Sequence, residues 1–272
     1  LSCCIVAFLN YEFAMGFDKQ HEHYEEIYQV SIYRDQNGAK EPFGFAPMVL
    51  GDVIQEELPT VERVTKFERA GLTIKRENNI FNRTVAFVDE SFMDMFSFKM
   101  LYGNPKSYNE RAAVLISDKV AMALFGEINA VGQTIELVRA SQSNLLFTVG
   151  GVFEEPGLQS TLQFQLVSSF ENFYRLFDVE RTDWTRLIDG LFIQSKEPNI
   201  IEKAPQVLSK YAEIQSEARQ DFQVASFWLQ DMEEIAFNSR DMNGTNLGNE
   251  TLHPQHITAP NIMALLILLL AC

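Results

Sequence analysis

The sequence predicts an α+β domain held between two short apolar segments. Three observations lead to this: a length of 272 residues, strand and helix patterns that alternate along the body, and apolar runs at both ends. A chain of this length buries a full core, and 46% hydrophobic with 22% charged residues is typical of a globular protein. We therefore expect a folded body with a membrane link at each end.

The two end segments are apolar but short. Residues 3–15 read CCIVAFLNYEFAM, and residues 262–272 read IMALLILLLAC. A membrane-spanning helix needs about 20 apolar residues, so each run predicts only a part of one. We expect residues 1–15 to end a first transmembrane helix and residues 259–272 to start a second. An amphipathic core helix is the alternative for each run, and LLILLL argues against it because this stretch has no polar face.

The charge of the chain limits its partners and its location. A net charge of −15 repels phosphate backbones, whose binding depends on Lys and Arg, so no nucleic acid partner is expected. Basic residues are also sparse beside the apolar runs, with Lys19 near the first and Arg240 near the second. Cytoplasmic flanks are usually rich in Lys and Arg. The body is therefore expected on the non-cytoplasmic side.

Alternating and apolar segments predict the strands. After a short charged helix at 16–26, Tyr28, Val30 and Ile32 alternate with polar residues, which is typical of a strand with one buried face. Turn residues separate the later segments, and one such turn is predicted at 70–71. In chain order the predicted strands are 27–32, 60–67, 72–75, 80–88, 98–101, 112–116, 134–138, 145–152, 161–167, 191–194 and 222–229.

Helical spacing and terminal signals predict the helices. Ser117 or Asp118 caps a helix that ends at Gly126, and Pro205 either starts or kinks another. Residues 238–258, rich in Asn and Gly at first, form the predicted connection to the second apolar run. The predicted helices are 47–57, 90–96, 118–125, 171–177 and 201–212.

No catalytic, cofactor-binding or metal-ligating residue is predicted, and no substrate-binding residue is identified. His21 and His23 come closest to a metal pair, but residues two apart do not share a helix face, so a solvated, charged helix end is the preferred interpretation. Residues 126–134 (GEINAVGQT) lack the spacing and the lysine of a phosphate loop. Gly150 and Gly151 indicate a bulge or close packing.

Four motifs follow one another along the body. They are FDKQHEHYEEIYQV after the first apolar run, VDESFMDMFSFKMLYGNP, AAVLISDKVAMALFG with AVGQTIEL, and FTVGGVFEEP. Their order and spacing, with an aliphatic second run after them, resemble the extracytoplasmic core domain of MacB/FtsX-type ABC transporter permeases. Family members commonly have a proline where this chain has Ala130, which affects only that local turn.

The resemblance implies a fold, partners and a location. It implies a porter-like α/β subdomain at 16–88 and 157–237, interrupted by a smaller inserted α/β subdomain at 89–156. It also implies a separate cytoplasmic ATPase, a second permease domain in a homodimer or pseudo-dimer, and the periplasmic side of a bacterial inner membrane. The resemblance supplies no catalytic residue and no cofactor.

The predicted function is non-enzymatic. The domain is expected to transmit ATP-driven helix movement to the export or extraction of a substrate. The main alternative is a ligand-sensing ectodomain of a two-helix membrane receptor, with one completed span that leads to a cytoplasmic signalling helix. A membrane-anchored hydrolase is a third interpretation, and it would need a convergent polar pocket.

Overall fold

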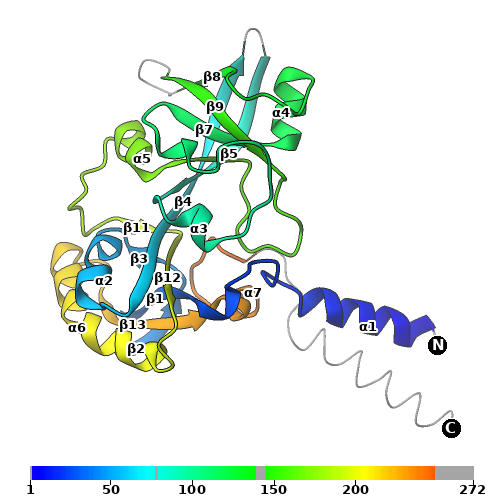
Figure 1. The fold of residues 1–272 in the computed structure, drawn as a ribbon. Coiled ribbons are helices and arrows are strands. Elements are labelled where there is room, and N and C mark those ends of the chain that lie inside the picture. Colours follow the sequence, from blue (N-terminus) through cyan, green and yellow to red (C-terminus); the bar gives the residue numbers. More distant parts are fainter. Residues whose placement is uncertain (1, 77–78, 139–144, 249–272) are drawn as a thin grey trace.

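A large mixed sheet forms the frame of the computed structural model, which describes residues 2–76, 79–138 and 145–248 (Figure 1). Its strands are β1 Ile27–Gln36, β2 Ala39–Phe43, β4 Val61–Arg76, β5 Asn79–Val88, β6 Met100–Gly103, β7 Ala113–Ser117, β8 Thr134–Val138, β9 Leu145–Phe153, β10 Leu166–Ser169, β12 Gly190–Ser195 and β13 Val224–Asp231. The strand order is β13-β1-β12-β4-β5-β10-β7-β9-β6, with β2 on β1 and β8 on β4 and β9. A separate small sheet pairs β3 Ala46–Pro47 with β11 Leu187–Ile188.

Strand β4 connects the two halves of the molecule. Its first half, up to Phe67, pairs with β12, and its second half, from Phe67 onward, pairs with β5. At about 3.3 Å per residue, the 16 residues of β4 span roughly 50 Å. We call residues 27–67 with 187–238 the base lobe and residues 68–186 the tip lobe. Figure 1 shows β4 rising from the base lobe into the tip lobe.

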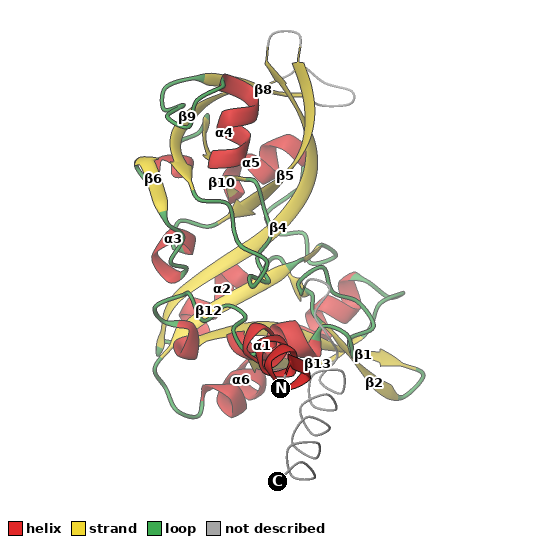
Figure 2. Cartoon of the chain, turned by 90° about the vertical axis from the view of Figure 1, so that its right-hand side faces the viewer, coloured by secondary structure: helices red, strands yellow, loops and turns green. Residues whose placement is uncertain are grey.

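Helices cover both faces of the sheet (Figure 2). The larger core cluster lies under four of them, which are α2 Leu50–Glu57, α4 Asp118–Phe125, α5 Phe170–Phe177 and α6 Ile200–Ala218. The second cluster includes side chains of the short helices α3 Phe92–Met95 and α7 Ile235–Asn238. Short 3-10 helices lie at Tyr24–Glu26, Ser107–Asn109 and Met232–Glu234.

The two clusters result from the period-two alternation of the strands. In β5, Val85 and Phe87 belong to the larger cluster, whereas Ala86 and Val88 belong to the other. Successive side chains of a strand point to opposite faces, so a strand that is buried on both faces is apolar throughout. The sheet is therefore the middle layer of three.

Local sequence signals predicted several elements correctly. The Ser117 hydroxyl accepts a hydrogen bond from the Val120 amide at the start of α4, and Gly126 ends the helix in the left-handed conformation. The register between β7 and β9 passes over Gly150, which forms the expected bulge. Close packing is present as well, because a Cβ on Gly150 would collide with Ser107. Pro205 lies inside α6.

Several local predictions were wrong. Residues 16–23 form turns rather than the predicted charged helix, and residues 161–165 of a predicted strand lie outside β10. No turn interrupts β4 at Ala70 and Gly71, because both residues pair in register with β5. Strand β1 is buried on both faces, since Gln29 and Ser31 are as inaccessible as Val30. The Gln29 amide donates to the Gly44 carbonyl and accepts from Gln230, so distant residues cover its polar face.

The N-terminal helix α1, Ser2–Ala14, extends from the base of the molecule (Figure 1). Several of its apolar side chains are exposed, among them Ile5, Val6, Phe8 and Leu9. Among the described residues, no helix has both the length and the apolar character that crossing a membrane requires. The second predicted apolar segment, 259–272, lies outside the described residues.

Candidate functional site

The segment that follows α1 binds to the connection between β9 and β10, which we call the connecting segment (residues 154–165). The Asp18 amide donates to the Gln159 carbonyl at 2.9 Å, and the Gln159 side chain donates to the Phe13 carbonyl at 2.8 Å. One Asp18 carboxylate oxygen accepts from the Thr161 amide at 2.9 Å. The end of α1 is therefore fixed to a segment that belongs to the tip lobe.

Asp18 and His21 are buried together in this turn. The backbone of Asp18 is left-handed, with φ of 57°, and the second carboxylate oxygen has no hydrogen-bond partner among the described residues. Burial raises the pKa of Asp18 to about 6 and lowers the pKa of His21 to about 4. At neutral pH the imidazole is therefore neutral, and the 4.0 Å separation from Asp18 is not an ion pair.

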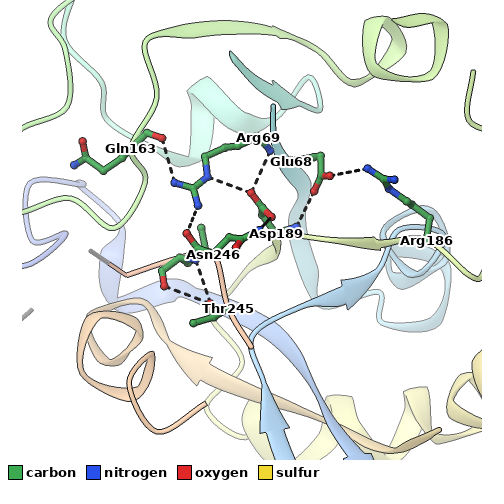
Figure 3. A network of polar contacts seen from close by, with 8 residues as sticks. Glu68, Arg69, Gln163, Arg186, Asp189, Thr245 and Asn246 are labelled. Atoms are coloured by element: carbon green, nitrogen blue, oxygen red, sulfur yellow. Dashed lines mark hydrogen bonds and ion pairs between the residues drawn. The ribbon is translucent and has the colours of Figure 1, made fainter. Parts of the chain in front are cut away.

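The connecting segment also reaches the middle of β4. Figure 3 shows the Arg69 guanidinium among three acceptors, the Gln163 carbonyl, the Asn246 carbonyl and the Asp189 carboxylate. Asp189 lies at the start of β12 and is 4% exposed. Its second carboxylate oxygen accepts from the Asn246 side-chain amide at 2.6 Å. Asn246 belongs to the residues that follow α7, which we call the C-terminal segment (residues 239–248). Arg69 thus joins the tip lobe, the base lobe and the C-terminal segment.

Glu68 completes this network on the opposite face of β4. Its carboxylate accepts from Arg186 at 2.9 Å and from the Asp189 backbone amide at 2.9 Å. Burial, followed by the negative charge of Asp189, raises the pKa of Glu68 to about 7. We call Glu68, Arg69, Arg186, Asp189 and Asn246 the polar junction.

A second charge cluster surrounds the buried side chain of Lys66, two residues earlier on β4. The Lys66 ammonium pairs with Asp52 of α2 and lies 3.7 Å from Asp89, which follows β5. Its stem passes over Gly51, where a Cβ would lie 2.8 Å from the Lys66 Cγ. Burial alone would lower the pKa of Lys66, but the neighbouring charges, with Asp89 foremost, raise it. Burial raises the pKa of Asp89 to about 6.

His21 and His23, both interpreted from the sequence as part of a solvated helix end, have different environments. His21 is buried rather than solvated, because its ring packs edge-on against Phe96 and Phe98, and its Nδ1 accepts from the Ser97 amide. His23 is partly exposed, 3.7 Å from Glu26. Within the described parts of the chain, no group of three or more His, Cys, Asp or Glu residues is arranged to hold a metal ion.

Sequence reasoning did not identify the polar junction. Its members lie at positions 68, 69, 186, 189 and 246, and the contacts among them span as many as 177 positions. One local signal was available, since KFER places three charges around a phenylalanine in the middle of a long strand. Charged residues are rarely buried unless they are paired, so such a run in a central strand predicts buried partners.

Comparison with known proteins identifies the family. The model of the MacB-like periplasmic core domain matches residues 1–211. No curated protein sequence matches the chain.

Three solved structures show the same fold. A domain described as that of a permease protein from Porphyromonas gingivalis is 20% identical, with a TM-score of 0.57 over 78% of this chain and 91% of that one. The periplasmic region of MacB from Actinobacillus actinomycetemcomitans is 12% identical, with a TM-score of 0.51 over 81% and 92%. The extracellular domain of the ABC-type transporter YknZ from Gram-positive bacteria is 15% identical, with a TM-score of 0.51 over 73% and 98%.

These likenesses agree with the mixed α/β fold that the resemblance implied. The family model covers more than half of the chain, from α1 into α6. The chain therefore belongs to the MacB-like periplasmic core domains of ABC transporter permeases.

Proposed function

We propose that this domain transmits ATP-driven movement of membrane helices to the export or extraction of a substrate, without catalysing a reaction itself. The observation that carries the proposal is the polar junction. Arg69 binds both the C-terminal segment, at Asn246, and the connecting segment, at Gln163. The connecting segment in turn binds the end of α1.

The path has two short links and one stiff element. The first link joins the end of α1 to the connecting segment through Asp18 and Gln159. The second joins the connecting segment to Arg69 on β4. Strand β4 is paired along almost its whole length, so a displacement at Arg69 moves both lobes. Coupling of this kind travels through hydrogen-bonded and packed groups that are attached to rigid elements.

The membrane setting, the partners and the domain boundary belong to the same proposal. A separate cytoplasmic ATPase would supply the movement, a second permease domain would complete a dimer, and the chain would lie on the periplasmic side of a bacterial inner membrane. The exposed apolar side chains of α1 support contact with lipid. The inserted subdomain at 89–156 remains a prediction. Strand β10 lies outside that range, yet it pairs with β7 inside the range as well as with β5.

Distance measurements on the full-length permease with its ATPase test this role. Spin labels at Glu127→Cys in the tip lobe and Glu213→Cys on α6 report the lobe separation, with native cysteines replaced by serine. We expect ATP to change that distance, and Arg69→Gln to reduce the change. Arg83→Gln on β5 is the matched control, since among the described residues Arg83 donates only to the adjacent Asn82 carbonyl and otherwise lies over the nearby Phe81 ring.

Two outcomes would contradict the proposal. One is a lobe separation that does not respond to ATP in the wild-type permease. The other is an equal response in the Arg69 and Arg83 variants, which would show that the polar junction does not carry the movement. A response to a small molecule without the ATPase would instead favour the ligand-sensing receptor.

A further inference from the structure

A pocket of about 300 Å³ lies where β5 and β10 end. The two strands are parallel, with Val88 opposite Ser169, so their carboxyl ends meet at one edge of the sheet. In open α/β sheets, ligands bind in the crevice outside the carboxyl ends of parallel strands. We call this the strand-end pocket, and the residues that line it are Val88, Asp89, Glu90, Asn109, Ser169, Phe170 and Glu171.

The charges around this pocket do not balance. The carboxylates of Asp89 and Asp52 share one ammonium, that of Lys66. Glu90 is exposed, and among the described residues its carboxylate has no ion-pair or hydrogen-bond partner. Glu171, which also lines the pocket, is paired with Arg181, so Glu90 is the lining carboxylate that lacks a partner among the described residues. An adjoining pocket of about 490 Å³, also lined by Asp89 and Glu90, includes the Asp52 carboxylate.

A buried hydroxyl in the same wall also lacks a partner. Ser169 lines the strand-end pocket and is 4% exposed, and within the described residues its Oγ makes no hydrogen bond. Ser169 stands at the N-cap of α5 without capping it. Buried polar atoms are nearly always hydrogen-bonded, so an orphaned hydroxyl in a pocket wall indicates a group that the pocket receives.

We propose that the strand-end pocket binds an alkylammonium group, held by the Glu90 carboxylate and the Ser169 hydroxyl. An ammonium donates up to three hydrogen bonds, which suits a carboxylate and a hydroxyl oxygen as acceptors. Phe170 supplies apolar wall for the methylene groups that carry the amine. The same chemistry is offered by a free polyamine and by a lysine side chain of a basic peptide.

Two other ligand classes fit the pocket less well. The N-terminus of α5 would favour an anion, but Asp89, Glu90 and Glu171 place negative charge around it. A compact metal ion needs three or more converging ligands, and the described residues provide no such group of His, Cys, Asp and Glu. Succinate and Mg²⁺ are therefore the comparison probes.

Titration calorimetry of the full chain in detergent micelles tests the proposal at low salt, with spermidine in one arm and tetralysine in the other. We expect saturable binding of at least one amine. Glu90→Gln and Ser169→Ala should each weaken it, the first by about tenfold, which corresponds to one charge-assisted hydrogen bond. Glu127→Gln removes the same charge from an exposed glutamate after α4 and should leave the affinity unchanged.

The two arms identify the source of the amine. Binding of spermidine with tetralysine inactive assigns a polyamine, and the reverse result assigns a basic peptide. Thermal unfolding checks that Glu90→Gln folds as the wild type does, which is expected because the Glu90 side chain is exposed and has no partner in the described part of the chain. This inference does not rest on mechanical transmission, since the measurement needs neither ATP nor the ATPase.

Three results would overturn the proposal. They are the absence of saturable binding of both amines, equal affinities of the Glu90 and Glu127 variants, and tighter binding of succinate or Mg²⁺ than of either amine. Equal affinities would show that the general negative charge of the chain attracts the amine without a defined site.

Discussion

The polar junction and the strand-end pocket lie close to each other along the sheet, but they treat their charges differently. In the polar junction, Asp189 accepts hydrogen bonds from both Arg69 and Asn246, and Glu68 accepts one from the Arg186 guanidinium, whose buried Nε lacks a hydrogen-bond partner among the described residues. In the strand-end pocket, Glu90 and the Ser169 hydroxyl are unpaired among the described residues. A paired buried network holds segments together, whereas unpaired groups at a pocket wall are available to a ligand.

The comparison predicts that substitutions in the polar junction lower stability, whereas substitutions in the pocket wall lower only binding. Removing one member of a buried pair leaves the other charge without compensation. Removing a buried atom that has no partner costs no hydrogen bond. The predictions below are ordered from the largest expected change in the free energy of unfolding to the smallest.

Asp189→Ala should have the largest effect. It removes the only described carboxylate that binds both Arg69 and the Asn246 side chain. We expect the free energy of unfolding to fall by about 3 kcal/mol, which is typical of a broken buried ion pair. Urea denaturation measures the change. In Asp221→Ala, a 78% exposed partner of Arg219 is lost, so less than about 1 kcal/mol is expected. Equal losses would show that the polar junction does not hold the segments.

Lys66→Met should be the next largest change. It removes the cation between Asp52 and Asp89 and keeps most of the stem volume. We expect a loss of about 2 kcal/mol at pH 8, because two carboxylates then face each other without compensation. The loss should shrink as the pH falls toward about 6, because without the Lys66 charge Asp89 takes up its proton above the pKa of about 6 that it has in the wild type. The double variant with Asp89→Asn should recover stability at pH 8, and no recovery would contradict this explanation.

Glu68→Gln should change how stability depends on pH. The pKa of Glu68 is raised from 4.5 to about 7 in the folded state, chiefly by burial and then by Asp189. The folded protein therefore holds more protons than the unfolded chain between these values, and this contribution to stability is lost as the pH rises through about 7. The neutral glutamine has no such loss.

The measurement is the difference in unfolding free energy between Glu68→Gln and the wild type from pH 4.5 to pH 8. We expect the variant to become steadily more stable relative to the wild type as the pH rises. His21 and Asp18 titrate in both proteins, so their contributions cancel in the difference. A difference that moves the other way would mean that Arg186 holds the carboxylate ionised.

Ser169→Ala should have the smallest effect on stability. Its hydroxyl makes no hydrogen bond among the described residues, so we expect a change within about 0.5 kcal/mol. The adjacent Ser168 is the matched control, because its hydroxyl accepts from the Asn172 side chain at 3.0 Å. Ser168→Ala should cost about 1 kcal/mol. Equal losses in thermal unfolding would mean that the Ser169 hydroxyl already has a partner.

The sequence determined the elements whose signals are local. The cap at Ser117, the end of α4 at Gly126 and the bulge at Gly150 lie within a few residues of the groups that cause them. The order of the motifs identified the family, which the family model confirmed over residues 1–211. The ATPase, the dimer and the transport role stay predictions.

Only the tertiary structure decided how distant segments meet. Strand β4 stays extended through Gly71 because β5 pairs with it, although the local signal predicts a turn. His21 is buried because residues 96–98 cover it, and Gln29 because distant polar groups satisfy its amide.

The polar junction and the strand-end pocket are also formed by contacts between segments that are distant in the sequence. Arg69 meets Asn246 across 177 positions, and Val88 lies opposite Ser169 because β5 and β10 are parallel. Periodicity reports which face of an element is apolar, but not which element covers that face. Long-range pairing supplies that information, and both the proposed path of movement and the proposed amine site depend on it.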